Sequence, residues 1–279
     1  LDDMRLGIPN VTGTQEPQEW ARELRALGCG CVVLPVGADD SLHKVREYAR
    51  CAREQGLNIA EVWSWCNPVA PDEQERRNAI ETCKHRLRLA DEIGAECCVN
   101  VAGSAGAIWK GAYAENLSRE MWERTVRSIQ EILDAVKPTH TYYTVEAMPY
   151  MFPTGPQEYH QLLDAVARDR FAVHMDVCNW ISSPQRFFRN PDFMEQCFEL
   201  LGPYIRSCHL KDVRLRQALV CQLEEVPCGQ GGMDLERYLA LAERYKPDMP
   251  MILEHLQGSA AYIKSIYYLK NRFQGKFKL

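Results

Sequence analysis

The chain has 279 residues, of which 46% are hydrophobic and 25% are charged, a balance typical of folded globular proteins. Its formal net charge of −5 argues against a nucleic-acid partner, because such partners attract basic surfaces. Apolar runs stay well short of the roughly 20 residues that a membrane-spanning helix needs, so we expect no membrane association. The length suits one large α/β domain covering residues 1–279.

Twelve cysteines are spread along the chain, and none forms a CxxC pair. Most lie in apolar stretches, such as Cys31 in GCVVLPV and Cys208 in IRSCHL, which is typical of reduced and buried thiols. Because free thiols persist in reducing compartments, we expect a cytoplasmic protein. A thiolate zinc site is the alternative, but the ligand spacing that it requires is missing.

Short apolar runs alternate with longer amphipathic segments along the whole chain. The apolar runs predict strands over residues 5–9, 31–36, 57–65, 97–102, 142–147, 171–177, 205–210 and 251–256. The amphipathic segments predict helices over residues 16–27, 41–55, 72–93, 118–136, 157–167, 191–201, 234–245 and 260–273. Ser118 is placed to cap the fourth of these helices.

Eight strand–helix units, of about 35 residues each, predict an α/β fold of the (β/α)8 type, a TIM barrel in a single domain. The strands are continuously apolar, as expected for a parallel sheet that is covered on both faces. A doubly wound open sheet is the alternative, but no GxGxxG motif follows the first strand. An excursion over residues 215–232 lengthens the seventh unit.

Four side chains of metal-ligand type end successive predicted strands: Glu146 in TYYTVEAMP, Asp176 in FAVHMDVCN, His209 in IRSCHLKD and Glu254 in PMILEHL. Their separations of 30, 33 and 45 residues correspond to one strand–helix unit each. Because strand ends in a TIM barrel meet at one rim, we expect the four to converge. Taken singly, each would more often be an ion-pair partner or a hydrogen-bonded core residue.

The predicted convergence of these four side chains leads us to expect a bound divalent metal ion. Three carboxylates without a counter-ion would cost several kcal/mol each to desolvate, and a divalent cation removes that cost. Three carboxylates and one imidazole favour Mn²⁺, with Mg²⁺, Co²⁺ and Zn²⁺ as alternatives.

The segments VEAMP, HMDVCN, SCHLKD, ILEHL and VPCGQGGMD resemble the sugar phosphate isomerase/epimerase superfamily, also called xylose isomerase-like barrels. The resemblance covers nearly the whole chain and implies a divalent metal held by Glu146, Asp176, His209 and Glu254. It also implies that Glu146 and Glu254 are the catalytic acid/base groups. One departure is Asn179, three residues after the aspartate, where ketose epimerases usually carry a substrate-contacting histidine.

The resemblance implies a metal-dependent isomerase or epimerase that acts on a keto-sugar or polyol through an enediolate intermediate. A metal-dependent lyase on the same site is the alternative, of the inosose dehydratase or C-glycoside-cleaving type, and Asn179 favours it. An apurinic endonuclease would need more metal ligands and a basic face, and a non-enzymatic ligand-binding barrel is the remaining hypothesis. Relatives also lead us to expect a homo-oligomer, a dimer or a tetramer.

Further residues are candidate contacts for a small carbohydrate substrate. Lys211 shares a strand face with His209 and could hold a substrate oxygen, or form an ion pair with Asp212 at the rim. His255 should point away from the site, because neighbours on a strand face opposite sides. The remaining candidates, some of which could equally be packing residues, are Trp65, Asn100, Trp109, His174 and Asn179.

Overall fold

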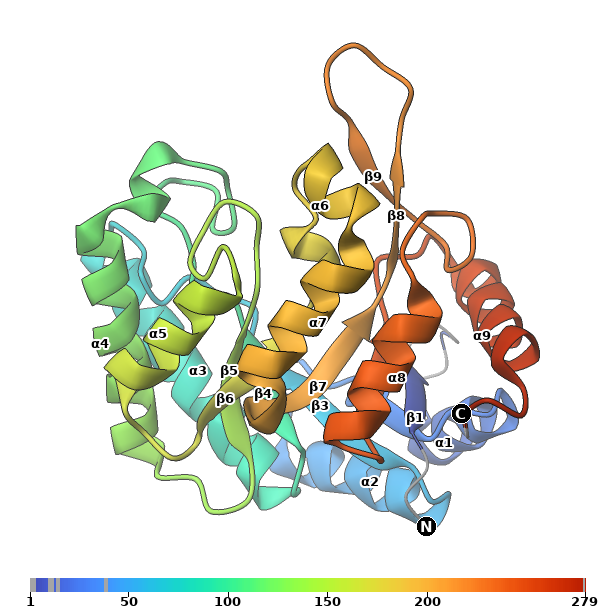
Figure 1. The fold of residues 1–279 in the computed structure, drawn as a ribbon. Coiled ribbons are helices and arrows are strands. Elements are labelled where there is room, and N and C mark those ends of the chain that lie inside the picture. Colours follow the sequence, from blue (N-terminus) through green and yellow to red (C-terminus); the bar gives the residue numbers. More distant parts are fainter. Residues whose placement is uncertain (1–3, 10–12, 14–15, 38–39, 278) are drawn as a thin grey trace.

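Eight parallel strands close into a barrel in the computed structural model, which describes residues 4–9, 13, 16–37, 40–277 and 279 (Figure 1). Going around the barrel, the strands follow one another in chain order, and each pairs in parallel with its neighbours. They are β1 (Arg5–Ile8), β2 (Cys31–Val33), β3 (Asn58–Trp63), β4 (Cys97–Asn100), β5 (Tyr142–Glu146), β6 (Phe171–Met175), β7 (Ile205–Leu210) and β10 (Pro250–Leu253). The predicted (β/α)8 barrel is confirmed.

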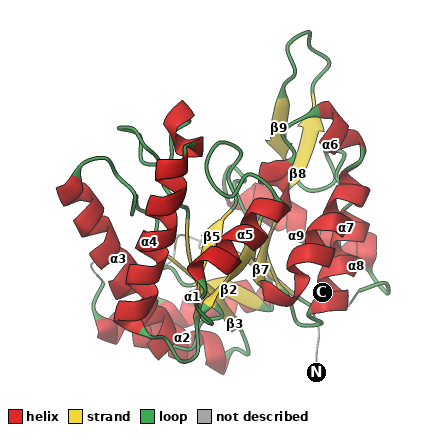
Figure 2. Cartoon of the chain, turned by 60° about the vertical axis from the view of Figure 1, so that its left-hand side comes forward, coloured by secondary structure: helices red, strands yellow, loops and turns green. Residues whose placement is uncertain are grey.

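Helices surround the barrel and cover the outer face of the sheet (Figure 2). Ser118 caps α4 by accepting a hydrogen bond from the Met121 amide, as predicted. The long helices are α1 (Pro17–Ala26), α2 (Leu42–Glu54), α3 (Glu73–Glu92), α4 (Arg119–Val136), α5 (Pro156–Val166), α7 (Asn190–Leu201), α8 (Leu235–Tyr245) and α9 (Ser259–Phe273). A short additional helix, α6 (Pro184–Phe188), was not predicted.

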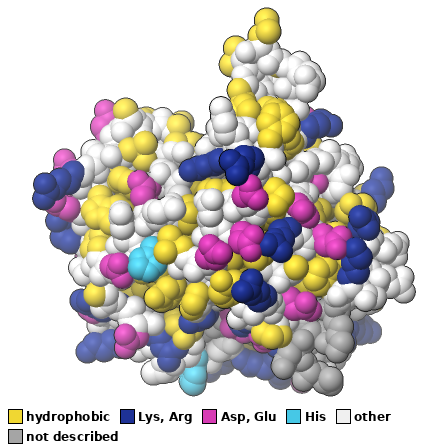
Figure 3. All heavy atoms as spheres, viewed as in Figure 1, with side chains coloured by type: hydrophobic (Ala, Val, Ile, Leu, Met, Phe, Trp, Pro, Cys, Tyr) yellow, Lys and Arg dark blue, Asp and Glu magenta, His cyan; other side chains and the backbone are white. Residues whose placement is uncertain are grey.

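The excursion after β7 is an antiparallel hairpin, made of β8 (Asp212–Leu215) and β9 (Leu223–Val226). It projects beyond the barrel, where Figure 1 shows it as the orange loop at the top. Leu219 and Val220 at its tip are exposed, so hydrophobic side chains gather there in the space-filling view (Figure 3). Over the rest of that face, acidic and basic side chains are interspersed.

Ten of the twelve cysteines are buried, as their apolar surroundings predict, and all twelve are free thiols. Cys221, on the projecting hairpin, is the exposed one, and Cys66 is half-buried. Among the helices that the structure describes, none is long and apolar enough to cross a membrane.

Asp91, near the end of α3, ties that helix to the segment before β5. Its carboxylate accepts hydrogen bonds from the amides of Thr139, His140 and Thr141, at 2.9, 2.6 and 3.0 Å. Partial burial opposes ionisation, but these three donors outweigh it and lower the pKa of Asp91.

We expect Asp91→Asn to destabilise the protein by about 1 kcal/mol at pH 7, because charge-assisted hydrogen bonds are lost. A lowered carboxyl pKa stabilises the fold above the pKa of the unfolded chain, and this contribution disappears as the pH falls through the folded-state pKa. The difference between the two proteins should therefore shrink toward pH 3, as measured by urea unfolding across pH. A constant difference would contradict the electrostatic explanation.

Candidate metal centre

The four predicted ligands converge at the carboxyl end of the barrel. Glu146 is the last residue of β5, Asp176 follows β6, His209 lies in β7, and Glu254 follows β10. One ligand atom from each lies within 4.8 Å of all the others, and all four residues are buried. The Nδ1 atom of His209 is 3.4 Å from Glu146 Oε1, 3.4 Å from Asp176 Oδ2 and 3.0 Å from Glu254 Oε2. The expected convergence is therefore present, and the ligand role stays a prediction.

Asn179 holds two members of this cluster in place. A 3-10 turn over residues 177–180 follows β6, and Asp176 caps it by accepting a hydrogen bond from the Asn179 amide at 3.3 Å. The Asn179 side chain donates to Glu146 Oε1 and to the Ala147 carbonyl, both at 2.9 Å. Asn179 is thus positioned to orient Glu146.

Lys211 also reaches the cluster, where its ammonium lies among the carboxylates. Its Nζ is 2.6 Å from Asp176 Oδ2, 2.8 Å from Glu254 Oε2 and 3.7 Å from Glu146 Oε1. The alternative pair with Asp212 does not form, because the Asp212 carboxylate accepts backbone amides instead. Lys211 supplies part of the positive charge that the buried carboxylates need.

This donor set fits a divalent cation. The cluster offers the three buried carboxylates of Glu146, Asp176 and Glu254 together with Nδ1 of His209, with one ligand atom from each within 4.8 Å of the others. Oxygen ligands with one imidazole nitrogen are the set that Mn²⁺ and Mg²⁺ prefer, and Zn²⁺ also accepts it. Glu146, Asp176, His209 and Glu254 would hold the cation, with Lys211 as a neighbouring positive charge.

The two glutamates differ in their electrostatic environment. Burial and the neighbouring Glu254 carboxylate raise the pKa of Glu146 to about 7. Burial also disfavours ionised Glu254, but the positive charges of His209 and Lys211 dominate and lower its pKa. Of the two, Glu146 is therefore the carboxyl that takes up a proton more readily.

A pocket lies directly above the two glutamates. Trp65 and Trp109 line it, as predicted for substrate contacts, and Lys110 beside Trp109 was missed by the sequence reasoning. The rings of Trp65 and Trp63 lie 5.4 Å apart, so Trp65 is also packed against a neighbour. The pocket therefore offers aromatic walls and one extra cation above an acidic floor.

The prediction that His255 points away from the site is wrong. Its φ of 59° is left-handed, which breaks the alternation of a strand and brings the ring back toward the rim. The ring lines the pocket, with Nδ1 2.8 Å from Glu225 Oε2 on β9 and 3.2 Å from Lys211 Nζ. His255 thus connects the hairpin to the cluster.

Two predicted substrate contacts, Asn100 and His174, are fully buried and do not line the pocket. Asn100 accepts a hydrogen bond from the Cys66 amide at 3.2 Å and donates to Cys83 Sγ at 3.3 Å. His174 lies one layer below the cluster, where Ser207 Oγ is 2.7 Å from its Nδ1. Strand alternation predicts that His174 shares the inward face of Asp176, and the structure places its ring in the barrel interior behind the ligands, away from the pocket.

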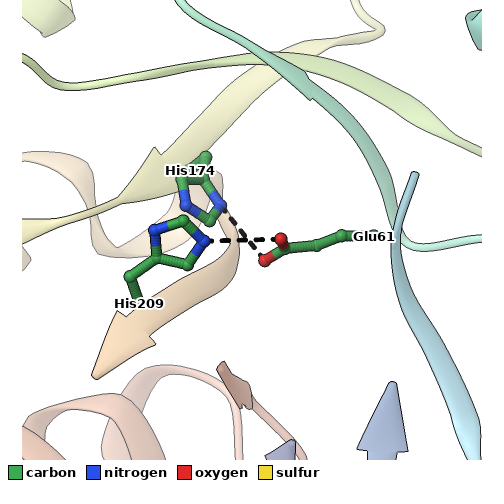
Figure 4. Close-up of side chains that lie close together, drawn as sticks. All are labelled: Glu61, His174 and His209. Atoms are coloured by element: carbon green, nitrogen blue, oxygen red, sulfur yellow. Dashed lines mark ion pairs between the residues drawn. The ribbon is translucent and has the colours of Figure 1, made fainter. Parts of the chain in front are cut away.

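Glu61, on β3, completes a second buried layer beneath the cluster (Figure 4). Its Oε2 accepts a hydrogen bond from Trp63 Nε1 at 2.7 Å and lies 3.5 Å from His209 Nε2. Its Oε1 lies 3.4 Å from His174 Nδ1. A charged residue in the middle of the strand NIAEVW is the sequence signal for this layer.

The chain belongs to the xylose isomerase-like TIM barrel family, whose sequence pattern it matches over residues 21–272. No curated protein matches the sequence. The solved structures described next are all at most 15% identical to this chain, so their similarity shows a shared fold and nothing finer.

Three structures that share the fold and carry enzyme names serve as examples. The probable 3-DHS dehydratase AsbF of Bacillus anthracis is 15% identical, with a TM-score of 0.73 over 96% of this chain and 100% of that one. The 3-keto-D-glucoside 4-epimerase YcjR of E. coli is 12% identical, with a TM-score of 0.71 over 96% and 99%. Endonuclease IV of Thermus thermophilus is 15% identical, with a TM-score of 0.73 over 96% and 98%.

Proposed function

We propose that this protein is a divalent-metal-dependent isomerase or epimerase that acts on a keto-sugar or polyol through an enediolate. The observation that carries the proposal is the cluster of Glu146, Asp176, His209 and Glu254, with its ligand atoms within 4.8 Å at the floor of the pocket. Mn²⁺ is the metal we favour. A cytoplasmic homo-oligomer that binds neither nucleic acid nor membranes remains our expectation.

The chain's own groups have distinct tasks in this reaction. A bound divalent cation would supply Lewis-acid stabilisation of the charge that develops on the substrate oxygens. Glu146 and Glu254 border the pocket from β5 and β10, so one removes the proton next to the carbonyl and the other returns it to the opposite face. Trp65 and Trp109 pack against the sugar and exclude water from the site.

A lyase on the same site is the second candidate. Asn179 favours it, because its amide cannot gain or lose a proton and is already engaged with Glu146 and the Ala147 carbonyl. The same enediolate then eliminates a β-substituent instead of being reprotonated. The similarity in fold to structures named as a dehydratase and as an epimerase is compatible with either outcome.

The deciding experiment is incubation of the Mn²⁺-loaded protein with a panel of keto-sugars in D₂O. We expect deuterium at the carbon next to the carbonyl, detected by NMR and mass spectrometry. An epimerase returns an isomeric sugar that differs in mass only by deuterium, whereas a dehydratase yields a product lighter by one water. Protein that holds metal but exchanges no substrate proton would contradict both candidates.

Metal binding itself is testable without a substrate. We expect one Mn²⁺ per chain by elemental analysis, and an increase in Tm that EDTA reverses. A ligand that binds only the folded state stabilises it by about 2.7 kcal/mol at 100 times its Kd. An unchanged Tm at saturating Mn²⁺, or protein that retains no metal, would contradict the site.

A further inference from the structure

We propose that Glu61 is a positioning residue that fixes the orientation and tautomer of His209 and thereby sets the metal affinity of the cluster. The inference rests on the proposed metal site. It assigns a function to the second buried layer of the barrel, which contacts neither the pocket nor the solvent.

The two ring nitrogens of His209 face different layers. Nδ1 faces the three carboxylates of the cluster, the nearest being Glu254 Oε2 at 3.0 Å. Nε2 faces away from them, 3.5 Å from Glu61 Oε2 (Figure 4). A metal-binding nitrogen must be unprotonated, so binding through Nδ1 requires the proton on Nε2. Glu61 Oε2 is the acceptor placed to receive that proton in a hydrogen bond.

Glu61 is held where it is by its neighbours. The Trp63 indole donates to Oε2 at 2.7 Å, and His174 Nδ1 lies 3.4 Å from Oε1. His174 is in turn anchored by Ser207 Oγ at 2.7 Å. The Trp63 indole is therefore the direct hydrogen-bond partner that holds Oε2 beside His209, and Ser207 acts on Glu61 only indirectly, through His174.

Unsatisfied atoms point to the same role. Glu61 Oε1, His174 Nε2 and His209 Nε2 are buried and lack hydrogen bonds of good geometry. The Trp63 bond satisfies only Oε2, and a fully buried carboxylate with one unsatisfied oxygen destabilises the fold, so a purely structural Glu61 would be a poor choice. A cation bound by His209 would increase the positive charge of the imidazole ring. The buried Glu61 carboxylate would then stabilise that charge and be stabilised by it.

The test measures the Co²⁺ affinity and the visible absorption spectrum of Glu61→Gln and Glu61→Met. Co²⁺ is the probe because its d–d bands report the geometry of the ligands. Loss of a carboxylate behind a metal-bound histidine weakens metal affinity by about 10–100-fold. We expect that loss for Glu61→Met, together with altered d–d bands. Glu61→Gln should lie between it and the wild type, because the amide oxygen still accepts a hydrogen bond.

The thermal stability of the metal-free proteins is expected to change in the opposite direction to their Co²⁺ affinity. We expect both Glu61 variants to have a Tm in EDTA equal to or above the wild-type value, because a buried charge is removed. Ser207→Ala is the matched control, since it disturbs the same layer through His174 and leaves Glu61 and His209 in place. Its Kd for Co²⁺ should stay within twofold of the wild type.

The outcomes separate this inference from the proposed function. Wild-type affinity in both Glu61 variants would overturn the inference alone. A Tm loss in EDTA with an affinity loss equal to that of Ser207→Ala would also overturn it, because general loosening of the layer would explain both. A wild-type protein that binds no Co²⁺ or Mn²⁺ would overturn the inference and the proposed function together.

Discussion

Replacing Glu146 or Glu254 by Gln should lower the rate of proton exchange into the substrate by roughly 10²–10⁴-fold, because an amide can neither take up nor release the transferred proton. The measurement is the deuterium exchange assay at Mn²⁺ concentrations that saturate each variant, so that weaker metal binding is not mistaken for slower proton transfer. The effect should fall on kcat for both positions, since both side chains border the pocket.

Glu224→Gln is the matched control for these variants. Glu224 lies on the hairpin near the rim, but its carboxylate pairs with Arg214 on the neighbouring strand and does not belong to the cluster. Its exchange rate should stay within twofold of the wild type. If Glu146→Gln or Glu254→Gln kept more than a tenth of the wild-type rate at saturating metal, that residue would not be an acid/base group.

Asp212→Ala should destabilise the protein by about 3 kcal/mol or more, because several backbone donors would be left without their acceptor at a buried position. The buried carboxylate accepts hydrogen bonds at 2.9–3.0 Å from the amides of Val213, Gly229, Gly231 and Met233. It thus ties the hairpin to the segment that leads into α8. The free energy of unfolding in urea measures the loss.

Asp212→Asn tests whether the acceptor pattern or the shape matters. Its single amide oxygen can satisfy only one pair of donors, and its NH₂ group then faces the other pair, so we expect a loss of about 2 kcal/mol or more. The control is Glu236→Gln, which removes one exposed ion pair with Lys276 and should leave the free energy of unfolding nearly unchanged. The expected loss for Asp212→Ala is about 3 kcal/mol. A free energy of unfolding within about 1 kcal/mol of the wild-type value would therefore contradict the anchoring role.

The barrel and the convergence of the cluster were predictable because both depend on periodic features of the chain. Strands buried on both faces leave continuous apolar runs, so β5, β6 and β7 were evident in the sequence. A charged or imidazole side chain at the end of such a run stands out, and a spacing of one strand–helix unit brings Glu146, Asp176 and His209 to one rim. These inferences need the strand order but no loop geometry.

The features that were missed depend on local geometry or on depth along the barrel. The direction of His255 follows from a left-handed backbone, which no residue type at that position announces. Asn100 lies at a strand end, yet its side chain does not face the pocket. It forms hydrogen bonds with the Cys66 amide and the buried Cys83 thiol instead. Glu61 lies near the middle of its strand, so a search confined to strand ends could not connect it with His209.

The pocket and the layers beneath it come from different parts of the architecture. Trp109 and Lys110 belong to the connection after β4, and His255 lies in the segment after β10, so these pocket walls lie outside the paired strands of the barrel. If the proposed function holds, grafting these walls from a relative should change the substrate preference while the cluster keeps its geometry. The residues of the pocket walls can therefore change during evolution without a change in the cluster, so one barrel can serve several reactions.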